Sequence, residues 1–266
     1  MFNNKDKVIF FDIDGTLFEP HIGIPDSTIY SLNKLKENNV SIVICTGRAR
    51  AMVPQSIIAL GFDGIIAGAG TYVEINENVI YEISLDCASS SRLITDIRNY
   101  GLIPILEGHK VSYYDDTSQD EDYRRVLNNY FKEAKPNMLP IPENYSNICI
   151  AKASARFTST GDDKGLFEKY KNEYNIVCHS GLLMEFIPKY TSKAKGIEVF
   201  LKETGIKPEN TYAFGDSMND LEMLQYVQYG IAMGNSSDEF KQKINYITDD
   251  IDKDGIYNAL VNFKLI

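Results

Sequence analysis

The sequence lacks any long apolar run. Of its 266 residues 44% are hydrophobic, yet no apolar stretch approaches the roughly 18 residues that a membrane-spanning helix needs. The first such stretch, Val8–Phe11, already ends at Asp12. The N-terminus also lacks a basic segment followed by a long apolar core. We therefore predict neither a membrane partner nor a secretory signal.

Positive charge is also scarce. The chain has 27 Lys+Arg against 37 Asp+Glu, a formal net charge of −10. Such a field repels nucleic acid and anionic membranes, so we predict neither as a partner. The balance of 44% hydrophobic and 24% charged residues is typical of a globular protein with one large or two modest domains.

Cysteines are few and unpaired in the sequence. Cys45, Cys87, Cys149 and Cys178 form no C-x-x-C motif, and two of them lie in apolar stretches. This favours buried reduced thiols over disulfides or a zinc site, and it favours a cytoplasmic location. The sequence does not indicate an oligomeric state, so a monomer is the default expectation.

Two patterns of secondary structure divide the chain. In residues 1–83 and 188–266, continuously apolar strands alternate with helices, which indicates a parallel sheet covered on both faces. We therefore predict an α/β fold with a Rossmann-like, doubly wound core. Strands are expected at 7–12, 41–45, 64–67, 211–214, 230–233 and 246–248, and helices at 25–38, 50–60, 192–204, 219–226, 238–243 and 256–263.

Residues 84–187 have a different character, with many tyrosines, short apolar strands and polar helices. This pattern predicts a separate α+β domain inserted into the first one. Glu107, Gly108 and His109 are expected to form a surface turn between two strands, and a loop that reaches into a ligand site stays open as the alternative. Strands are expected at 103–107, 110–114, 148–153, 155–158, 176–179 and 183–187.

Carboxylates follow two of the apolar strands of the core. Asp12 and Asp14 follow the first strand, and Asp216 and Asp220 follow the strand at 211–214. Open α/β sheets bind ligands at this edge, and residues two apart in an extended segment point the same way. Four carboxylates together need a positive partner, and oxygen ligands suit Mg²⁺.

A third strand end carries groups that suit a phosphate. The strand at 41–45 is followed by Thr46, Gly47 and Arg48, which offer a hydroxyl and an exposed backbone amide before a helix. Taken alone, Thr46 is more often explained as a helix cap. For Arg48, a ligand contact and a structural ion pair both stay open.

Four motifs occur in a fixed order: D-I-D-G-T at 12–16, T-G-R at 46–48, a lysine near the start of a helix, and G-D-S-M-N-D-L-E-M-L at 215–224. Together they resemble the haloacid dehalogenase (HAD) superfamily of phosphohydrolases, in particular the Cof-type subfamily (IIB) with a type 2B cap. The spacing of the family's lysine from the last motif falls on Lys193, with Lys195 as the alternative.

The resemblance implies a Mg²⁺-dependent phosphatase. Asp12 would be the nucleophile that forms an aspartyl phosphate, and Asp14 would be the general acid and base. Asp12, the backbone carbonyl of Asp14 and Asp216 would bind Mg²⁺. Asp220 would orient a metal-bound water or pair with Lys193.

The resemblance also implies how the phosphoryl group is bound. Thr46, the Gly47 amide, Lys193 and Asn219 would contact its oxygens. The expected substrates are small phosphorylated metabolites, with sugar phosphates favoured. A phosphomutase of the phosphomannomutase type and a phospholigand-binding protein without turnover stay open as alternatives.

Overall fold

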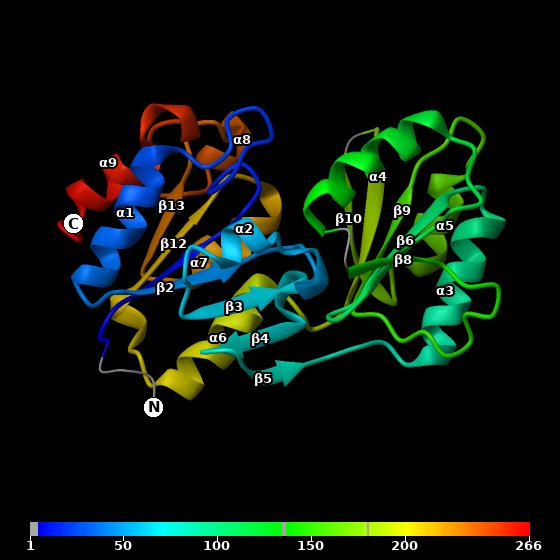
Figure 1. Cartoon of the computed structure of the whole chain (residues 1–266), viewed down its shortest axis with the longest axis horizontal. Helices are drawn as coiled ribbons and strands as arrows, with labels where there is room; N and C mark the ends of the chain where they lie inside the picture. Colours follow the sequence, from blue (N-terminus) through cyan, green and yellow to red (C-terminus); the bar gives the residue numbers. More distant parts are fainter. Residues whose placement is uncertain (1–4, 135–136, 180) are drawn as a thin grey trace. The chain divides into compact units, whose positions relative to one another are not determined.

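The computed structural model describes residues 5–134, 137–179 and 181–266. They form two compact units (Figure 1). Unit 1 comprises Met1–Gly47, Ala59–Tyr81 and Ser192–Ile266, and unit 2 comprises Arg48–Ile58 and Glu82–Thr191. The segment Arg48–Ile58, which the predicted boundaries placed in the core, thus groups with unit 2. The roles of the two units as catalytic core and cap stay predictions.

Unit 1 is built on an eight-stranded sheet in the order β14-β13-β12-β1-β2-β3-β4-β5. Strand β1 pairs in parallel with both β2 and β12, whereas β4 runs antiparallel to its neighbour β3. The predicted α/β fold with a parallel core sheet is confirmed. The strands are β1 (Val8–Phe11), β2 (Ser41–Cys45), β3 (Gly64–Ala67), β4 (Tyr72–Ile75), β5 (Asn78–Glu82), β12 (Thr211–Gly215), β13 (Tyr229–Ala232) and β14 (Tyr246–Ile247).

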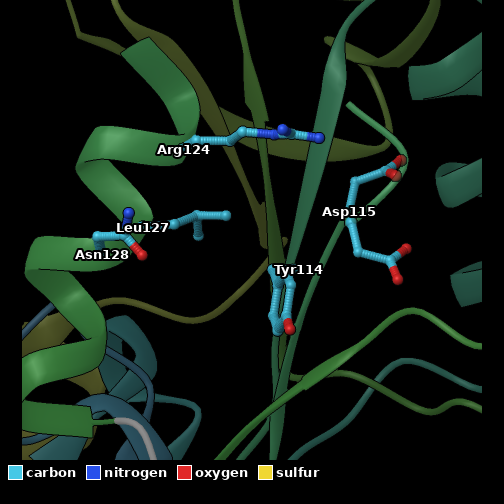
Figure 2. A pocket seen from close by; sticks show the side chains of 6 residues that line it. Tyr114, Asp115, Arg124, Leu127 and Asn128 are labelled. Carbon is cyan, nitrogen blue, oxygen red and sulfur yellow. The ribbon is translucent and has the colours of Figure 1, made fainter. Parts of the chain in front are cut away.

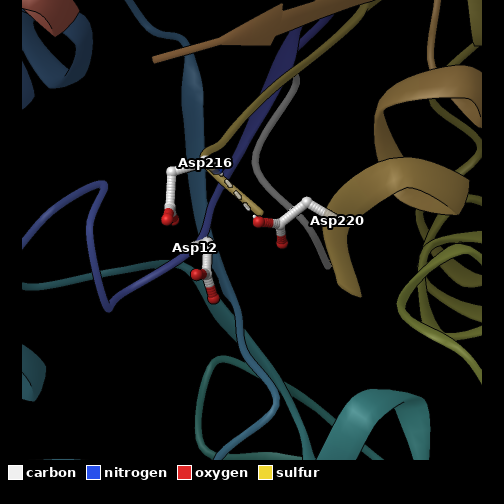
Figure 3. A group of neighbouring side chains, drawn as sticks. All are labelled: Asp12, Asp216 and Asp220. Carbon is white, nitrogen blue, oxygen red and sulfur yellow. Dashed lines mark hydrogen bonds between the residues drawn. The ribbon is translucent and has the colours of Figure 1, made fainter. Parts of the chain in front are cut away.

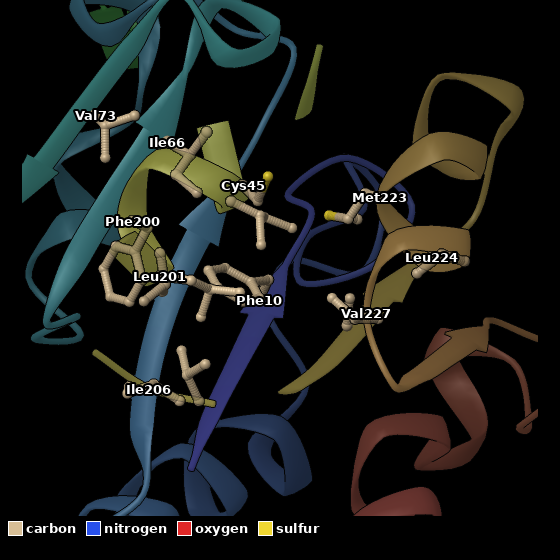
Figure 4. Packing of buried hydrophobic residues seen from close by; sticks show 14 of the residues in the cluster. Phe10, Cys45, Ile66, Val73, Phe200, Leu201, Ile206, Met223, Leu224 and Val227 are labelled. Carbon is tan, nitrogen blue, oxygen red and sulfur yellow. The ribbon is translucent and has the colours of Figure 1, made fainter. Parts of the chain in front are cut away.

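Helices cover both faces of this sheet. Successive strand residues point to opposite faces and are buried on both, so each face needs a layer of helices. The ring of Phe10 packs edge-on against the ring of Phe200 of helix α6 (Lys193–Thr204), with 5.5 Å between the ring centroids. Both belong to one buried cluster (Figure 4). Phe11 packs in a second cluster with Leu32 of α1 and Leu260 of α9. The helices of unit 1 are α1 (Asp26–Glu37), α6 (Lys193–Thr204), α7 (Leu221–Tyr226), α8 (Asp238–Lys241) and α9 (Gly255–Asn262).

The helix predicted at 50–60 is shorter than expected. A 3₁₀ turn at Arg50–Met52 is followed by helix α2 at Gln55–Ile58 only. Pro54 separates the two, since proline lacks an N–H and disfavours helical conformation in the residue before it.

Helix α6 begins in close contact with the turn after β3. Gly70 has φ +88°, and a Cβ there would lie 1.9 Å from the Ser192 carbonyl oxygen. A Cβ on Gly196 would lie 3.2 Å from the Gly70 Cα. Ser192 caps the helix, because its Oγ accepts a hydrogen bond from the Lys195 N–H at 3.2 Å. These contacts fix the position of Lys193, the first residue of α6.

Unit 2 has a six-stranded sheet in the order β10-β11-β9-β6-β7-β8. Helices occur between its strands along the chain, as predicted for an α+β domain. Leu106 and Phe186 pack on one face with Leu93 of α3 and Leu166 of α5. Helix α4 packs with Ile103 in a separate cluster. The elements are α3 (Cys87–Asn99), β6 (Ile103–Glu107), β7 (Ser112–Tyr114), α4 (Glu121–Ala134), β8 (Met138–Pro140), β9 (Lys152–Arg156), α5 (Asp163–Tyr170), β10 (Tyr174–His179) and β11 (Leu183–Pro188).

The strands predicted at 148–153 and 155–158 are in fact the single strand β9. Ile148 and Ile150 lie before it and are buried in the core of unit 2. The Ile150 carbonyl oxygen accepts a hydrogen bond from the Leu85 N–H at 2.8 Å. Their apolar character therefore reflects burial of an irregular segment, which hydrophobicity alone does not distinguish from a strand.

The cysteine prediction is wrong for one pair. Cys87, the first residue of α3, forms a disulfide with Cys149. Cys45 is free and buried, and Cys178 is free and exposed. The partners are 62 residues apart, so only the folding of unit 2 brings their Cα atoms to 4.5 Å. The disulfide removes the cysteine-based argument for a cytoplasmic location, which stays a prediction.

Among the helices of the described ranges, none has the length and hydropathy to cross a bilayer.

Alkylation of the denatured protein tests the disulfide. Without reductant we expect modification of Cys45 and Cys178 only, and of all four cysteines after reduction, as read by peptide mass spectrometry. Because the bond closes a 62-residue loop, reduction should lower the free energy of unfolding by about 4 kcal/mol. Modification of Cys87 or Cys149 in the unreduced protein would contradict the pairing.

Candidate active site

Carboxylates from two adjacent strands meet at the carboxyl edge of the unit 1 sheet (Figure 3). Asp12 directly follows β1, Asp216 directly follows β12, and Asp220 ends the 3₁₀ turn Met218–Asp220. One carboxylate oxygen of each lies within 4.8 Å of the others. The structure thus brings together three of the four predicted carboxylates, while the side chain of Asp14 is exposed.

Lys193 is the cation of this cluster. Its Nζ lies 2.6 Å from Asp12 Oδ1 and 2.5 Å from Asp220 Oδ1. The three side chains are 1%, 5% and 0% exposed, so each charge depends on its partners for the solvation that water would provide. Lys195, the alternative from the sequence, has a side chain that is 43% exposed and pairs with Glu198. The geometry therefore favours Lys193.

Asp220 is held by hydrogen bonds on both carboxylate oxygens. Oδ1 pairs with Lys193, and Oδ2 accepts hydrogen bonds from the backbone N–H groups of Asp216 and Ser217 at 3.0 and 3.1 Å. A Cβ on Gly215 would lie 2.6 Å from the Asp220 Cβ, which requires glycine at this close approach. Asp220 is thus positioned to orient Lys193.

Gly15 allows Asp216 to approach the D-G-T turn. Its φ is +78°, and a Cβ there would lie 2.5 Å from Asp216 Oδ2. Thr16 Oγ1 donates a hydrogen bond to Asp216 Oδ1 at 3.2 Å. Asn235, which the sequence motifs did not indicate, donates from Nδ2 to the Gly15 carbonyl oxygen at 2.9 Å. Its place shortly after β13, a further strand ending at this edge, is the signal that could have identified it.

The charges of this cluster do not balance. Burial and the charge of Asp220 raise the pKa of Asp12, against the opposing effect of Lys193. Burial, Asp220 and, to a lesser degree, Asp14 raise the pKa of Asp216 to about 7. Burial lowers the pKa of Lys193, but Asp12 and Asp220 outweigh it, so the ammonium stays charged. Carboxylate oxygens with surplus negative charge could bind a divalent cation.

The predicted phosphate-binding groups lie at neighbouring strand ends. Thr46 directly follows β2 and is buried, and its carbonyl oxygen accepts a hydrogen bond from the Ala69 N–H at 3.1 Å. A Cβ on Gly47 would lie 3.6 Å from Asn219 Nδ2, so these two residues are close. Ser217 Oγ donates to Asn219 Oδ1 at 2.8 Å. Since β2 lies beside β1, these groups share the edge that carries Asp12.

Three further predicted residues belong to unit 2. Arg48 Nη1 donates a hydrogen bond to the Met52 carbonyl oxygen at 3.5 Å, a local contact. The surface turn expected at 107–109 is wrong, because Glu107 and His109 are both buried. Glu107 instead ends β6 and pairs with Lys152 at 3.2 Å.

Unit 2 also contains a cavity of about 250 Å³ between β7 and α4 (Figure 2). Its buried carboxylate, Asp115, pairs with Arg98 at 2.9 Å, and Arg124 Nε donates to the Ser118 carbonyl oxygen at 3.0 Å. These charges already have partners within the protein, so the strand-end cluster is the candidate active site. The cavity is lined by Tyr114, Asp115, Asp116, Arg124, Leu127 and Asn128.

The carboxylate and lysine arrangement agrees with a comparison to known families. Residues 9–260 match the model of the haloacid dehalogenase-like hydrolases. The chain belongs to this family. This match confirms two predictions, namely the family indicated by the motifs and the enzyme class, a hydrolase.

Two solved structures and one curated protein illustrate what this chain is similar to over almost its whole length. A protein from Geobacillus kaustophilus HTA426 has 31% identity and a TM-score of 0.83, over 98% of this chain and 99% of that one. The HAD subclass IIB sugar phosphatase BT4131 has 27% identity and a TM-score of 0.84, over 98% and 100%. Pyridoxal phosphate phosphatase YbhA of Escherichia coli (strain K12) is 26% identical, over 94% and 96%.

The contact between Gly15 and Asp216 predicts the effect of an added methyl group. We expect Gly15→Ala to displace Asp216 and to weaken divalent-cation binding about tenfold or more, measured by calorimetry, because the new Cβ would overlap Oδ2. Gly23→Ala is the matched control, since Gly23 has the same φ of +78° and no atom lies within 4 Å of the position that its Cβ would take. Equal effects of the two substitutions would contradict this role of Gly15.

Proposed function

We propose that this HAD-like hydrolase is a Mg²⁺-dependent phosphatase of small phosphorylated metabolites, with sugar phosphates favoured. The observation that carries the proposal is Lys193 buried between Asp12 and Asp220, with Asp216 beside them at the strand edge. The activities named for BT4131 and YbhA, a sugar phosphatase and a pyridoxal phosphate phosphatase, support a phosphomonoester as substrate.

In the proposed reaction Asp12 is the nucleophile. Lys193 holds Oδ1, which orients the carboxylate for attack on phosphorus through its other oxygen. The new O–P bond forms as the bond from phosphorus to the substrate alcohol breaks, and Asp14 gives its proton to the departing alkoxide. Asp14 then takes a proton from the water that attacks the aspartyl phosphate, which releases inorganic phosphate and regenerates Asp12.

Charge stabilisation comes from several groups. Asp12, Asp216 and the Asp14 carbonyl oxygen would hold Mg²⁺, which neutralises phosphoryl charge when bound. An ammonium has three N–H donors, and two of those on Lys193 bind Asp12 and Asp220. The third remains for a phosphoryl oxygen.

Groups that follow β2 and β12 would complete the phosphate site. The Thr46 hydroxyl, the Gly47 N–H and the Asn219 amide would donate hydrogen bonds to the oxygens over which transition-state charge spreads. Because these groups are already placed at one sheet edge, little reorganisation is needed during the reaction.

Substitution of the nucleophile tests the proposal. We expect Asp12→Asn to lower phosphate release from glucose 6-phosphate and p-nitrophenyl phosphate at least about 1000-fold, because an amide does not form the acyl phosphate. Asp26→Asn, at an exposed site in the first turn of α1, is the control and should retain activity. Undiminished release from Asp12→Asn, or no release by the wild type with Mg²⁺, would contradict the proposal.

The same assay separates the alternatives. A phosphomutase would need a bisphosphate activator and would release almost no net phosphate from glucose 6-phosphate. A phospholigand-binding protein would bind the sugar phosphate in calorimetry without releasing phosphate at all. We expect release without any bisphosphate.

The raised pKa of Asp216 predicts how pH affects Mg²⁺ binding. Below about pH 7 the free protein carries a proton on this carboxyl that the cation must displace, and above it the carboxylate is ready to bind. Affinity should therefore rise up to about tenfold per pH unit between about pH 6 and pH 7 and then level off, with proton release detectable by calorimetry in two buffers. Asp216→Asn should bind weakly and lose this dependence. Affinity that is flat with pH in the wild type would refute the assignment.

A further inference from the structure

The turn that follows β1 is held by the side chain of Asn235, which lies three residues after β13. Asn235 Nδ2 donates to the Gly15 carbonyl oxygen at 2.9 Å, and Asn235 Oδ1 accepts from the Ile251 N–H at 3.0 Å. A carbonyl only accepts and a backbone N–H only donates, so these two partners determine which end of the amide faces Gly15. Asn235 is exposed, and holding an exposed side chain at both ends costs rotamer freedom.

The loop that carries Asn235 is itself fixed. The Gly234 N–H donates to the Asp249 carbonyl oxygen at 3.0 Å, and Lys241 Nζ donates to the Gly234 carbonyl oxygen at 2.8 Å. A Cβ on Gly234 would lie 2.6 Å from the Asp250 nitrogen, so the loop lies directly against this segment. Asn235 is therefore presented to Gly15 by a well-supported loop.

Gly15 is a residue that needs such a contact. Its φ is +78°, and because it lacks a Cβ, sterics restrain the peptide groups on either side of it only weakly. On one side the Gly15 N–H donates to the Phe18 carbonyl oxygen at 2.9 Å. On the other side the Thr16 N–H donates to the Ile13 carbonyl oxygen at the longer distance of 3.3 Å. The contact with Asn235 is thus the shorter of the two hydrogen bonds on the Gly15–Thr16 peptide.

The two peptide groups beside Gly15 carry groups of the proposed reaction. The Asp14 carbonyl oxygen, a proposed Mg²⁺ ligand, belongs to the peptide before Gly15. Thr16, after it, donates from Oγ1 to Asp216 Oδ1 at 3.2 Å. Each peptide group is rigid and planar, and the two share the Gly15 Cα, so a rotation at Gly15 would move Asp14 and Thr16 relative to Asp216.

We infer that Asn235 is a positioning residue, which holds the Gly15–Thr16 peptide so that Asp14 and Thr16 keep their places beside Asp216. For its effect on turnover the inference rests on the proposed function. Its effects on the turn and on cation binding do not depend on turnover. An uncharged donor suits this place, because a lysine or arginine would offset the negative charge that attracts a dication.

Substitution by alanine tests the inference through three measurements. In Asn235→Ala without metal, hydrogen exchange of the amides at 13–18 should become severalfold faster, because the turn opens more often. Mg²⁺ affinity in calorimetry should fall severalfold, because the Asp14 carbonyl is no longer held in place. With saturating Mg²⁺ and glucose 6-phosphate, kcat should fall severalfold while KM stays within about twofold, since the proposed phosphate-binding groups follow other strands.

The matched control is Asn38→Ala. Asn38, at the end of α1, also donates from Nδ2 to a distant backbone carbonyl, that of Leu265, at 2.8 Å. It precedes β2 by three residues and so lies at the amino edge of the sheet, away from the strand ends that carry the site. The control should lower the free energy of unfolding but leave exchange at 13–18, Mg²⁺ affinity and kcat as in the wild type.

A second variant tests the donor alone. Asn235→Asp keeps an oxygen for the Ile251 N–H but turns an oxygen instead of a donor toward Gly15. It should also speed exchange at 13–18, and it decides the question if Asn235→Ala does not fold.

Wild-type exchange and cation affinity in the folded Asn235 variants, or equal losses in Asn38→Ala, would overturn the inference. A wild type that binds Mg²⁺ but releases no phosphate would instead contradict the proposed function. Exchange and calorimetry use no turnover, so they would still decide the role of Asn235.

Discussion

The ion pair of Lys193 with Asp12 and Asp220 is the interaction on which the candidate active site depends. It joins the end of β1, the start of α6 and the turn after β12 in a region where none of these side chains is solvated. Loss of the ammonium would leave two carboxylates buried together, at a cost of about 3 to 5 kcal/mol. The close contact between Gly70 and Ser192 therefore matters, because it determines where α6 begins.

This ion pair also explains why a cation suits the site. One ammonium is shared by Asp12 and Asp220, so the charge of Asp216 has no equivalent partner among the described residues of the cluster. Burial and the charge of Asp220 raise the pKa of Asp216 to about 7. A dication would neutralise that surplus. An acidic chain with a net charge of −10 is thus compatible with an anionic substrate, because the sign of the field is reversed locally.

The predictions from the sequence agree best with the structure at the strand ends of unit 1, where candidate site residues directly follow apolar strands. Asp12, Thr46 and Asp216 could be placed at one sheet edge because each follows a continuously apolar strand. Lys193 and Lys195 both lie in the first turn of α6, so their local pattern does not distinguish them. The family spacing favoured Lys193, and the contacts of its Nζ with Asp12 and Asp220 support that choice. Asn235 also lies shortly after a strand that ends at this edge, β13, but it is outside the sequence motifs, and its contact is with the backbone of Gly15. Unit 2 was predicted less well, because burial of irregular segments imitates strands.

The two buried lysines share one arrangement, but the groups around each of them differ in charge. Lys193 and Lys152 each lie between two carboxylates from neighbouring elements, so each has a similar desolvation cost. They differ in what surrounds them. Beside Lys193 the additional group is an anion, Asp216, and the surplus negative charge suits a metal ion and through it a phosphate. Beside Lys152 the additional group is His179, whose Nε2 lies 3.2 Å from Glu185 Oε1. Each carboxylate there has a basic partner, so no surplus of negative charge is left to bind a cation.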